Sequence, residues 1–210
     1  VSAPIGVDFD RLNEMASDPA LDAEMEKLRR DLGLTFPLVG VGVDRLDYTK
    51  GIPERLAAID RLLEARPELA RTLTFVQIGV PSRSGIDSYQ EIERQIDDQV
   101  DAINARYRAR RGDEGPIRYR KINMKAKRLV ALFRLANFCI VSSLHDGMNL
   151  VAKEFVAARR DDDGVLVLSE LAGAAQELRD AVLINPYDID GFAARLEMAI
   201  DMPAAERRTR

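Results

Sequence analysis

Apolar and polar residues follow two alternating patterns along this chain. Short runs rich in Val, Ile and Leu, typical of buried strands, are separated by segments whose apolar residues recur every three or four positions, as on one face of a helix. The runs predict strands over residues 37–43, 73–78, 117–122, 137–141, 164–168 and 181–184. The periodic segments predict helices after Pro53, over 89–107, over 126–136, from Asn149, briefly after Gly173, and from about Asp190.

This order of elements predicts an α/β fold with a doubly wound, Rossmann-like parallel sheet. Strands that alternate with helices pair in parallel, through right-handed crossovers, and are covered on both faces. The half-polar alternation of residues 117–122 indicates an edge strand. Residues 1–36 are interpreted as a lead-in with one charged helix at about residues 18–32. We therefore expect one domain over residues 1–210.

Composition narrows the classes of function. The chain has 210 residues, of which 46% are hydrophobic and 31% charged, as in soluble globular domains. A net charge of −4 argues against a nucleic-acid partner, and no apolar stretch approaches the ~18 residues of a membrane span. The single Cys139 leaves no internal disulfide, and a signal-peptide pattern is absent. We expect a cytoplasmic protein and, because the initiator Met is missing, a piece of a longer one.

One charged segment follows the first predicted strand, in the sequence Val-Asp-Arg-Leu-Asp-Tyr-Thr-Lys-Gly of residues 43–51. Arg45 and Lys50 lie where a strand gives way to a helix, the junction at which α/β proteins bind anions. Arg suits bidentate phosphate contacts and Lys supplies a movable charge. The alternative is a pair of surface ion pairs, Arg45–Asp47 or Lys50–Glu54. Neither the GxGxxG fingerprint nor the GxxxxGK[ST] loop occurs.

A second segment, Leu-His-Asp-Gly-Met-Asn-Leu-Val-Ala-Lys-Glu of residues 144–154, opens a helix after the predicted strand 137–141. Gly147 permits close backbone approach and Asn149 is a suitable helix cap. Glu154 lies one turn into the helix, where a carboxylate can grip ribose hydroxyls, and Asp146 precedes it beside the position of a sugar. The alternative is a capped helix with exposed acids. Together the two segments predict a nucleotide-sugar site.

Other chemistry has little support in the sequence. Arg83, in a Ser-rich loop, is a weaker candidate for a phosphate contact. No His/Cys/Asp/Glu group has metal-ligand spacing, and no Ser/His/Asp order stands out. We therefore expect neither a metal nor a cofactor.

Several of these segments closely resemble the trehalose-6-phosphate synthase family, retaining glycosyltransferases of family 20 with the two-domain GT-B fold. The segments that carry the resemblance are residues 43–51, 81–85, 144–155, 165–178 and 184–188. The resemblance extends over the whole chain but only to the C-terminal, donor-binding half of the family. It implies an acceptor-binding N-terminal half and a final helix outside these residues.

The resemblance also implies a role for each candidate residue. Arg45 and Lys50 bind the donor diphosphate and, with Asp146, form the catalytic group. By the same resemblance, Asp146 and the backbone of Gly147, Met148 and Asn149 hold the glucose, and the Leu150 amide contacts a phosphate. Glu154 binds the ribose, and Ile78 and Met124 face the base. Arg83 contacts the phosphate of glucose 6-phosphate.

The activity implied is transfer of glucose from UDP-glucose to glucose 6-phosphate with retention and without a metal. The isolated chain is expected to be inactive without its N-terminal half, and an oligomer is compatible with the sequence. Glucosylglycerol-phosphate synthesis and a non-catalytic nucleotide-sugar-binding module (a pseudoglycosyltransferase) are the alternatives. Two departures are His145, where many relatives carry Arg, and Met124, where some carry an aromatic residue. The second leaves the choice among UDP, ADP and GDP open.

Overall fold

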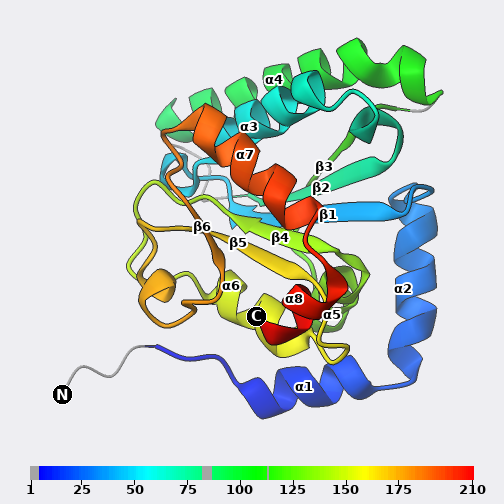
Figure 1. Cartoon of the computed structure of the whole chain (residues 1–210), viewed down its shortest axis with the longest axis vertical. Helices are drawn as coiled ribbons and strands as arrows, with labels where there is room; N and C mark the ends of the chain where they lie inside the picture. Colours follow the sequence, from blue (N-terminus) through cyan, green and yellow to red (C-terminus); the bar gives the residue numbers. More distant parts are fainter. Residues whose placement is uncertain (1–4, 82–86, 113) are drawn as a thin grey trace.

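The computed structural model describes residues 5–81, 87–112 and 114–210, which form one six-stranded sheet with the order β3-β2-β1-β4-β5-β6 (Figure 1). Every neighbouring pair of strands is parallel. The strands are β1 Leu38–Arg45, β2 Leu73–Val80, β3 Ile117–Lys121, β4 Phe138–Val141, β5 Val165–Ser169 and β6 Val182–Ile184. The predicted doubly wound parallel sheet is confirmed, and β3 lies at its edge.

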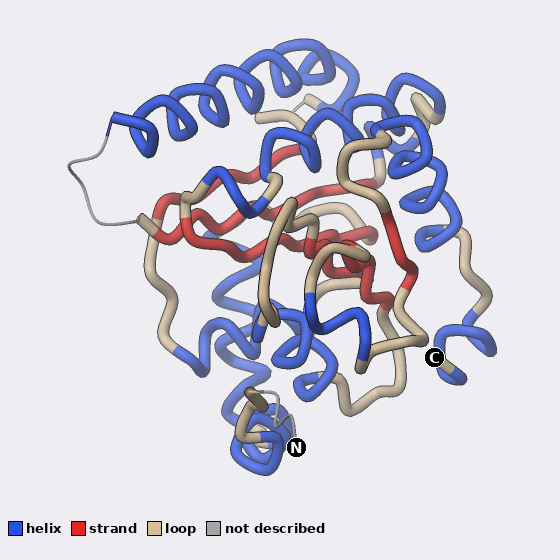
Figure 2. Tube along the Cα trace, turned by 90° about the vertical axis from the view of Figure 1, so that its left-hand side faces the viewer, coloured by secondary structure: helices blue, strands red, loops and turns tan. Residues whose placement is uncertain are grey.

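Helices cover both faces of the sheet (Figures 1 and 2). One face carries α3 Ile52–Ala65, α4 Asp87–Arg111 and α7 Ile189–Ile200, which share a hydrophobic core with the strands. The other carries α1 Phe9–Ser17, α2 Ala20–Asp31, α5 Ala126–Leu135 and α6 Leu150–Ala158 around a second core. The terminal helix is α8 Ala204–Thr209, and short 3₁₀ turns are η1 Tyr48–Lys50, η2 Leu69–Arg71 and η3 Gly173–Gln176.

Strand β1 at the centre of the sheet explains why two cores form. Val39, Val41 and Val43 alternate toward the core beneath α5 and α6. Glycines occupy the opposite face, and a Cβ at Gly40 would lie 2.3 Å from the ring of Phe138. The missing side chains leave room for groups from neighbouring strands and from α3. Since β1 lies between β2 and β4, the chain order reverses beside it, which is where open α/β sheets bind ligands.

The lead-in differs from its prediction, because it holds two helices rather than one. Helix α1 is capped by Asp8, whose side chain accepts a hydrogen bond from the Arg11 amide at 3.1 Å. It buries Ala16 and packs the partly buried Leu12 and Met15 against the second core, but its nine residues are a short stretch in which to recognise helical periodicity. Helix α8 was not predicted either, and it has no fully buried residue. The described helices include none with the length and apolar character that a bilayer crossing requires.

Candidate functional site

The two charged segments meet at a cavity of about 400 Å³ at the carboxyl ends of β1 and β4. Carboxyl ends of parallel strands share one edge of a sheet, so residues distant in sequence converge there. The cavity is lined by Val43, Asp44, Arg45, Lys50, Asp146, Met148, Asn149, Leu150, Val151 and Glu154. Most of the residues proposed from the sequence for a nucleotide-sugar site therefore surround one space.

Lys50 connects the two segments. The Asp47 side chain begins the η1 turn by accepting hydrogen bonds from the Thr49 amide at 2.9 Å and hydroxyl at 2.8 Å. The turn presents Lys50, whose Nζ lies 2.6 Å from Oδ2 of Asp146. Within the described residues, Lys50 pairs with Asp146 and not with Glu54, so the alternative of a Lys50–Glu54 surface pair is wrong.

Arg45 occupies the last position of β1, which runs two residues further than predicted. Its side chain is 62% exposed, and Nη2 lies 3.8 Å from Oδ2 of Asp47. The Arg45–Asp47 surface pair is thus present, but the distance is too long for a hydrogen bond. A loosely held guanidinium at the mouth of the cavity can turn toward an anion at small cost.

Asp146 accepts several hydrogen bonds besides that of Lys50. Asn149 Nδ2 donates to it at 3.1 Å, Ser143 Oγ at 3.3 Å and the Met148 amide at 3.4 Å. Burial opposes ionisation of Asp146, but these donors and the charge of Lys50 outweigh it, so its pKa lies below the usual value. The site therefore holds an ionised carboxylate with a fixed orientation.

The N-terminus of α6 faces the same cavity. Asn149 caps the helix, its Oδ1 accepting from the Ala152 amide at 3.1 Å. Its φ of 75° is uncommon for a non-glycine residue, a strain that costs about 1–3 kcal/mol and is concentrated at functional sites. Leu150 and Val151 belong to the first helical turn, whose amides lack acceptors within the helix. Those amides and the helix dipole favour an anion at this end.

Residues 171–174, which follow β5 and include the start of η3, pack against the backbone of the Asp146–Asn149 loop. The Gly173 amide donates to the Asp146 carbonyl at 2.9 Å and the Ala174 amide to the Met148 carbonyl at 2.8 Å. A Cβ on Gly173 would lie 2.1 Å from the Gly147 carbonyl oxygen, whereas a Cβ on Gly147 would meet nothing within 4 Å. The fold requires glycine at 173, but within the described structure it does not require one at 147.

These two glycines give a matched pair of variants. We expect Gly173→Ala to lower the free energy of unfolding by ~1–3 kcal/mol, because the backbone must move apart. Gly147→Ala should leave it within ~0.5 kcal/mol, as for an unobstructed surface site, but weaken binding of a ligand that packs on that backbone. Urea unfolding and calorimetric titration of UDP-glucose measure both effects. Equal destabilisation by the two variants would contradict this account of Gly147.

Glu154 lies one turn inside α6, and its half-buried side chain borders the cavity. Burial raises its pKa above the usual value. The carboxylate accepts no hydrogen bond from any residue in the described part of the chain. A half-buried carboxylate without hydrogen-bond donors destabilises the folded state unless a ligand supplies those donors.

Two predicted contacts lie away from the cavity, and a third falls outside the residues that the structure describes. Ile78 is fully buried in the core beneath α5 and α6, and Met124 packs against that core. Neither is among the described residues that line the cavity, and the Ile78 side chain offers no surface to a base. Arg83 lies outside the described residues. The roles assigned to all three stay predictions.

A group of buried polar side chains that was not predicted from the sequence lies beneath the cavity and comprises Asp44, Arg55, Gln77 and Ser142. Arg55 is fully buried and donates to the side chains of the other three. A signal was present in the sequence, because Arg55 shares the apolar stripe of α3 with Ile52, Leu56 and Ile59. A charge on a buried stripe indicates a buried partner.

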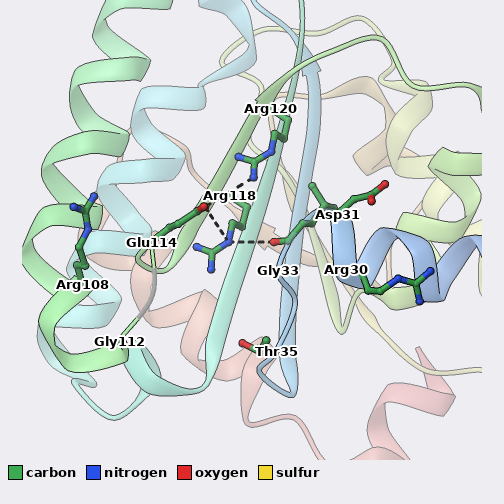
Figure 3. A pocket seen from close by; sticks show the side chains of 10 residues that line it. Arg30, Asp31, Gly33, Thr35, Arg108, Gly112, Glu114, Arg118 and Arg120 are labelled. Atoms are coloured by element: carbon green, nitrogen blue, oxygen red, sulfur yellow. Dashed lines mark hydrogen bonds and ion pairs between the residues drawn. The ribbon is translucent and has the colours of Figure 1, made fainter.

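A larger hollow of about 660 Å³ lies at the opposite, amino end of the sheet, beside the C-termini of α2 and α4 (Figure 3). Arg118 donates from Nε to the Leu32 carbonyl at 3.1 Å, and Arg118 and Arg120 lie 3.7 and 3.9 Å from the Glu114 carboxylate. Figure 3 shows Arg30 pointing away from these side chains. Arg118 caps the C-terminal end of α2 and pairs with Glu114, so we interpret the hollow as structural.

Comparison with protein families matches residues 1–210 to glycosyltransferase family 20. The chain is 45% identical over 209 residues to the bifunctional trehalose-6-phosphate synthase/phosphatase of Thermoproteus tenax, covering 97% of this chain and 27% of that protein. It is 42% identical over 210 residues to the trehalose-6-phosphate synthase of an Enterobacter species, covering 99% of this chain and 43% of the relative. The chain therefore spans less than half the length of either relative.

Solved structures agree with this assignment. The UDP-forming alpha,alpha-trehalose-phosphate synthase of Burkholderia xenovorans, solved with glucose-6-phosphate, superposes with a TM-score of 0.89 at 40% identity. It is matched over 100% of this chain and 46% of its own. An E. coli structure with UDP-2-fluoro glucose bound has a TM-score of 0.89 at 39% identity, over 98% of this chain and 45% of its own. On sequence and fold together, the chain belongs to glycosyltransferase family 20.

Proposed function

We propose that this chain is the donor-binding half of an enzyme that transfers glucose from UDP-glucose to glucose 6-phosphate, giving trehalose 6-phosphate and UDP with retention. The observation that carries the proposal is the 2.6 Å contact between Lys50 and Asp146 at the N-terminus of α6. It places a cation, an ionised carboxylate and free helix amides around one cavity. A nucleoside diphosphate linked to a sugar has matching groups for all three.

The chemistry of each group suggests its part. Lys50, Arg45 and the first amides of α6 would hold the diphosphate, while the Asp146 carboxylate would accept hydrogen bonds from glucose hydroxyls. As the bond between glucose and diphosphate breaks, negative charge develops on the leaving phosphate. Arg45 and Lys50 would stabilise that charge, and the phosphate would take the proton of the attacking hydroxyl. We propose that these two side chains supply the positive charge and that transfer uses no cofactor.

Support for the substrates comes from the relatives. One E. coli relative was solved with UDP-2-fluoro glucose, and the Burkholderia xenovorans relative was solved with glucose-6-phosphate. The acceptor would bind to the half of the enzyme that lies beyond these residues. Since the single Cys139 leaves no internal disulfide, we also propose a cytoplasmic location.

Calorimetric titration of UDP, ADP, GDP and UDP-glucose into the chain tests the donor assignment. We expect UDP and UDP-glucose to bind, with UDP tighter than ADP or GDP. Absence of binding by every nucleotide would overturn the proposal, and preference for ADP or GDP would reassign the donor.

Glu154 gives a test of the ribose contact. A ribose diol would donate two hydrogen bonds to this carboxylate, so Glu154→Gln should lower UDP affinity by about tenfold, the loss of a charge-assisted contact. Affinity for inorganic diphosphate, which has no ribose, should stay nearly unchanged. Because burial raises the pKa of Glu154, UDP affinity of the original chain should begin to fall at a higher pH than for an ordinary glutamate. That part of the pH profile should vanish in Glu154→Gln.

The control is Glu170→Gln, the same change at an exposed acid following β5. It should alter neither titration. If Glu154→Gln weakens UDP and diphosphate equally, Glu154 supports the helix and does not bind ribose.

A further inference from the structure

A fully buried ion pair lies directly beneath the proposed diphosphate site. Arg55 of α3 is 0% exposed, and its Nη1 donates to Oδ2 of Asp44 at 2.6 Å. Nη1 also donates to Gln77 Oε1 at 2.8 Å, and Nε donates to Ser142 Oγ at 3.0 Å. Room for the guanidinium comes from Gly42, where a Cβ would lie 2.2 Å from Nη1 of Arg55.

This group reaches each strand end that carries the site. Asp44 lies beside Arg45 at the end of β1, Gln77 lies in β2, and Ser142 follows β4. Ser142 Oγ in turn donates to the Gly51 carbonyl at 2.8 Å, immediately after Lys50. Through Ser142, Arg55 therefore links two parts of the site. One is the turn that carries Lys50, and the other is the end of β4, from which the chain continues to Asp146.

Stability alone is a weak reason for such a pair. Desolvation of two charges offsets most of their attraction, and well-packed apolar residues often replace a buried pair without loss. A reason specific to this position is the location of Asp44, which is buried but lines the cavity. A carboxylate in the wall of an anion site repels its ligand unless a cation compensates it.

We propose that Arg55 is a positioning residue of the donor site, which neutralises Asp44 and fixes the Lys50 turn so that the cavity stays attractive to a diphosphate. The inference rests on the proposed function. The inference extends the proposed function by assigning a role in ligand affinity to side chains that no ligand would touch. Removing one charge or the other should then change diphosphate affinity in opposite directions, although both changes harm the fold.

The test uses Arg55→Met, Asp44→Asn and the two combined, with UDP as the charged probe and uridine as the uncharged one. Arg55→Met leaves an uncompensated negative charge, so UDP affinity should fall about tenfold, as for a unit charge a few ångströms away in a partly screened medium. Asp44→Asn leaves an uncompensated positive charge on Arg55, which lies behind the cavity wall and not in it, so UDP should bind only about threefold tighter. The combined variant should return UDP affinity to between the two. Uridine affinity should not change in any variant.

Thermal unfolding separates these effects from damage to the fold. Both single variants should unfold at lower temperature than the original chain, because each leaves a buried charge unpaired. Arg118→Met is the matched control, since Arg118 is also buried but lies at the amino end of the sheet. It should lower the unfolding temperature and leave UDP affinity unchanged.

Opposite shifts in UDP affinity support the inference. Parallel losses in Arg55→Met and Asp44→Asn, or equal losses for UDP and uridine, overturn it and leave the pair a structural support. If Arg55→Met does not fold, Asp44→Asn still decides, because weaker UDP binding by that variant contradicts the inference. Failure of the original chain to bind UDP overturns the proposed function itself, a result that differs from all of these.

Discussion

Replacing Lys50 by Ala is expected to lower affinity for UDP by about 10- to 150-fold, the loss of a charge-assisted hydrogen bond worth ~1.5–3 kcal/mol. The effect should be large because the variant does more than remove a cation. It also leaves Asp146, which pairs with Lys50 at 2.6 Å, as an uncompensated carboxylate in the wall of the cavity. Calorimetric titration of UDP measures the change.

Two companion variants make the result specific. Arg45→Ala should weaken UDP binding at the lower end of the same range, because the exposed guanidinium must give up its solvent to bind. Lys127→Ala, at a surface pair with Asp18, should have no effect. Unchanged UDP affinity in both Lys50→Ala and Arg45→Ala, with the fold intact, would remove the diphosphate assignment.

The same pair gives an acid-sensitive contribution to stability. The pKa of Asp146 lies below its ordinary value of 3.8, because hydrogen bonds and Lys50 outweigh the effect of burial. An acid with a lowered folded-state pKa stabilises the protein above its unfolded-state pKa and loses that contribution as the pH falls through the folded-state value. Lys50→Ala should therefore reduce the difference in unfolding temperature between neutral and acidic pH.

Glucosyl transfer is expected to be absent from the isolated chain even where UDP-glucose binds. In a two-domain transferase the reaction takes place between the halves, and positioning of the two substrates supplies much of the rate. The chain matches only 43% of the length of its Enterobacter relative. Incubation with UDP-glucose and glucose 6-phosphate, followed by chromatography of sugar phosphates, should show no trehalose 6-phosphate.

Adding the N-terminal half of a relative completes this test. With the N-terminal half of the Enterobacter relative added or fused, we expect transfer to glucose 6-phosphate to begin. Transfer to glycerol 3-phosphate instead would favour the glucosylglycerol-phosphate alternative. Binding of UDP-glucose without any transfer would favour a non-catalytic module. Rapid turnover by the chain alone would refute the prediction and require an acceptor site within these residues.

The fold was largely predictable from the sequence because its pattern is local. A buried parallel strand appears in the sequence as a short apolar run, and a helix packed on one side appears as an apolar stripe, so the pattern predicts the six strands and the main helices. The exceptions follow the same rule. Helix α1 has nine residues and α8 has six, short stretches in which helical periodicity is hard to recognise.

The edge that holds the candidate site was also determined by the sequence. Arg45 ends β1 and Lys50 follows it, while Asp146 and Glu154 follow β4, and the carboxyl ends of parallel strands meet at one edge. Residue type and position after a strand were sufficient to predict a shared anion and sugar site there. The partners of those residues were not predictable in this way.

Only the tertiary structure decided which charges pair. Lys50 has Glu54 four residues away but contacts Asp146, 96 residues away. The sequence places Arg55 on the apolar stripe of α3, but only the folded structure shows that it packs over Gly42 and pairs with Asp44. The Gly147 carbonyl oxygen explains why residue 173 is glycine, whereas no described part of the fold explains why residue 147 is. The physical reason is the same in each case. Periodicity and capping depend on neighbours along the chain, whereas electrostatic compensation and close packing depend on distances between atoms that the folded chain alone sets.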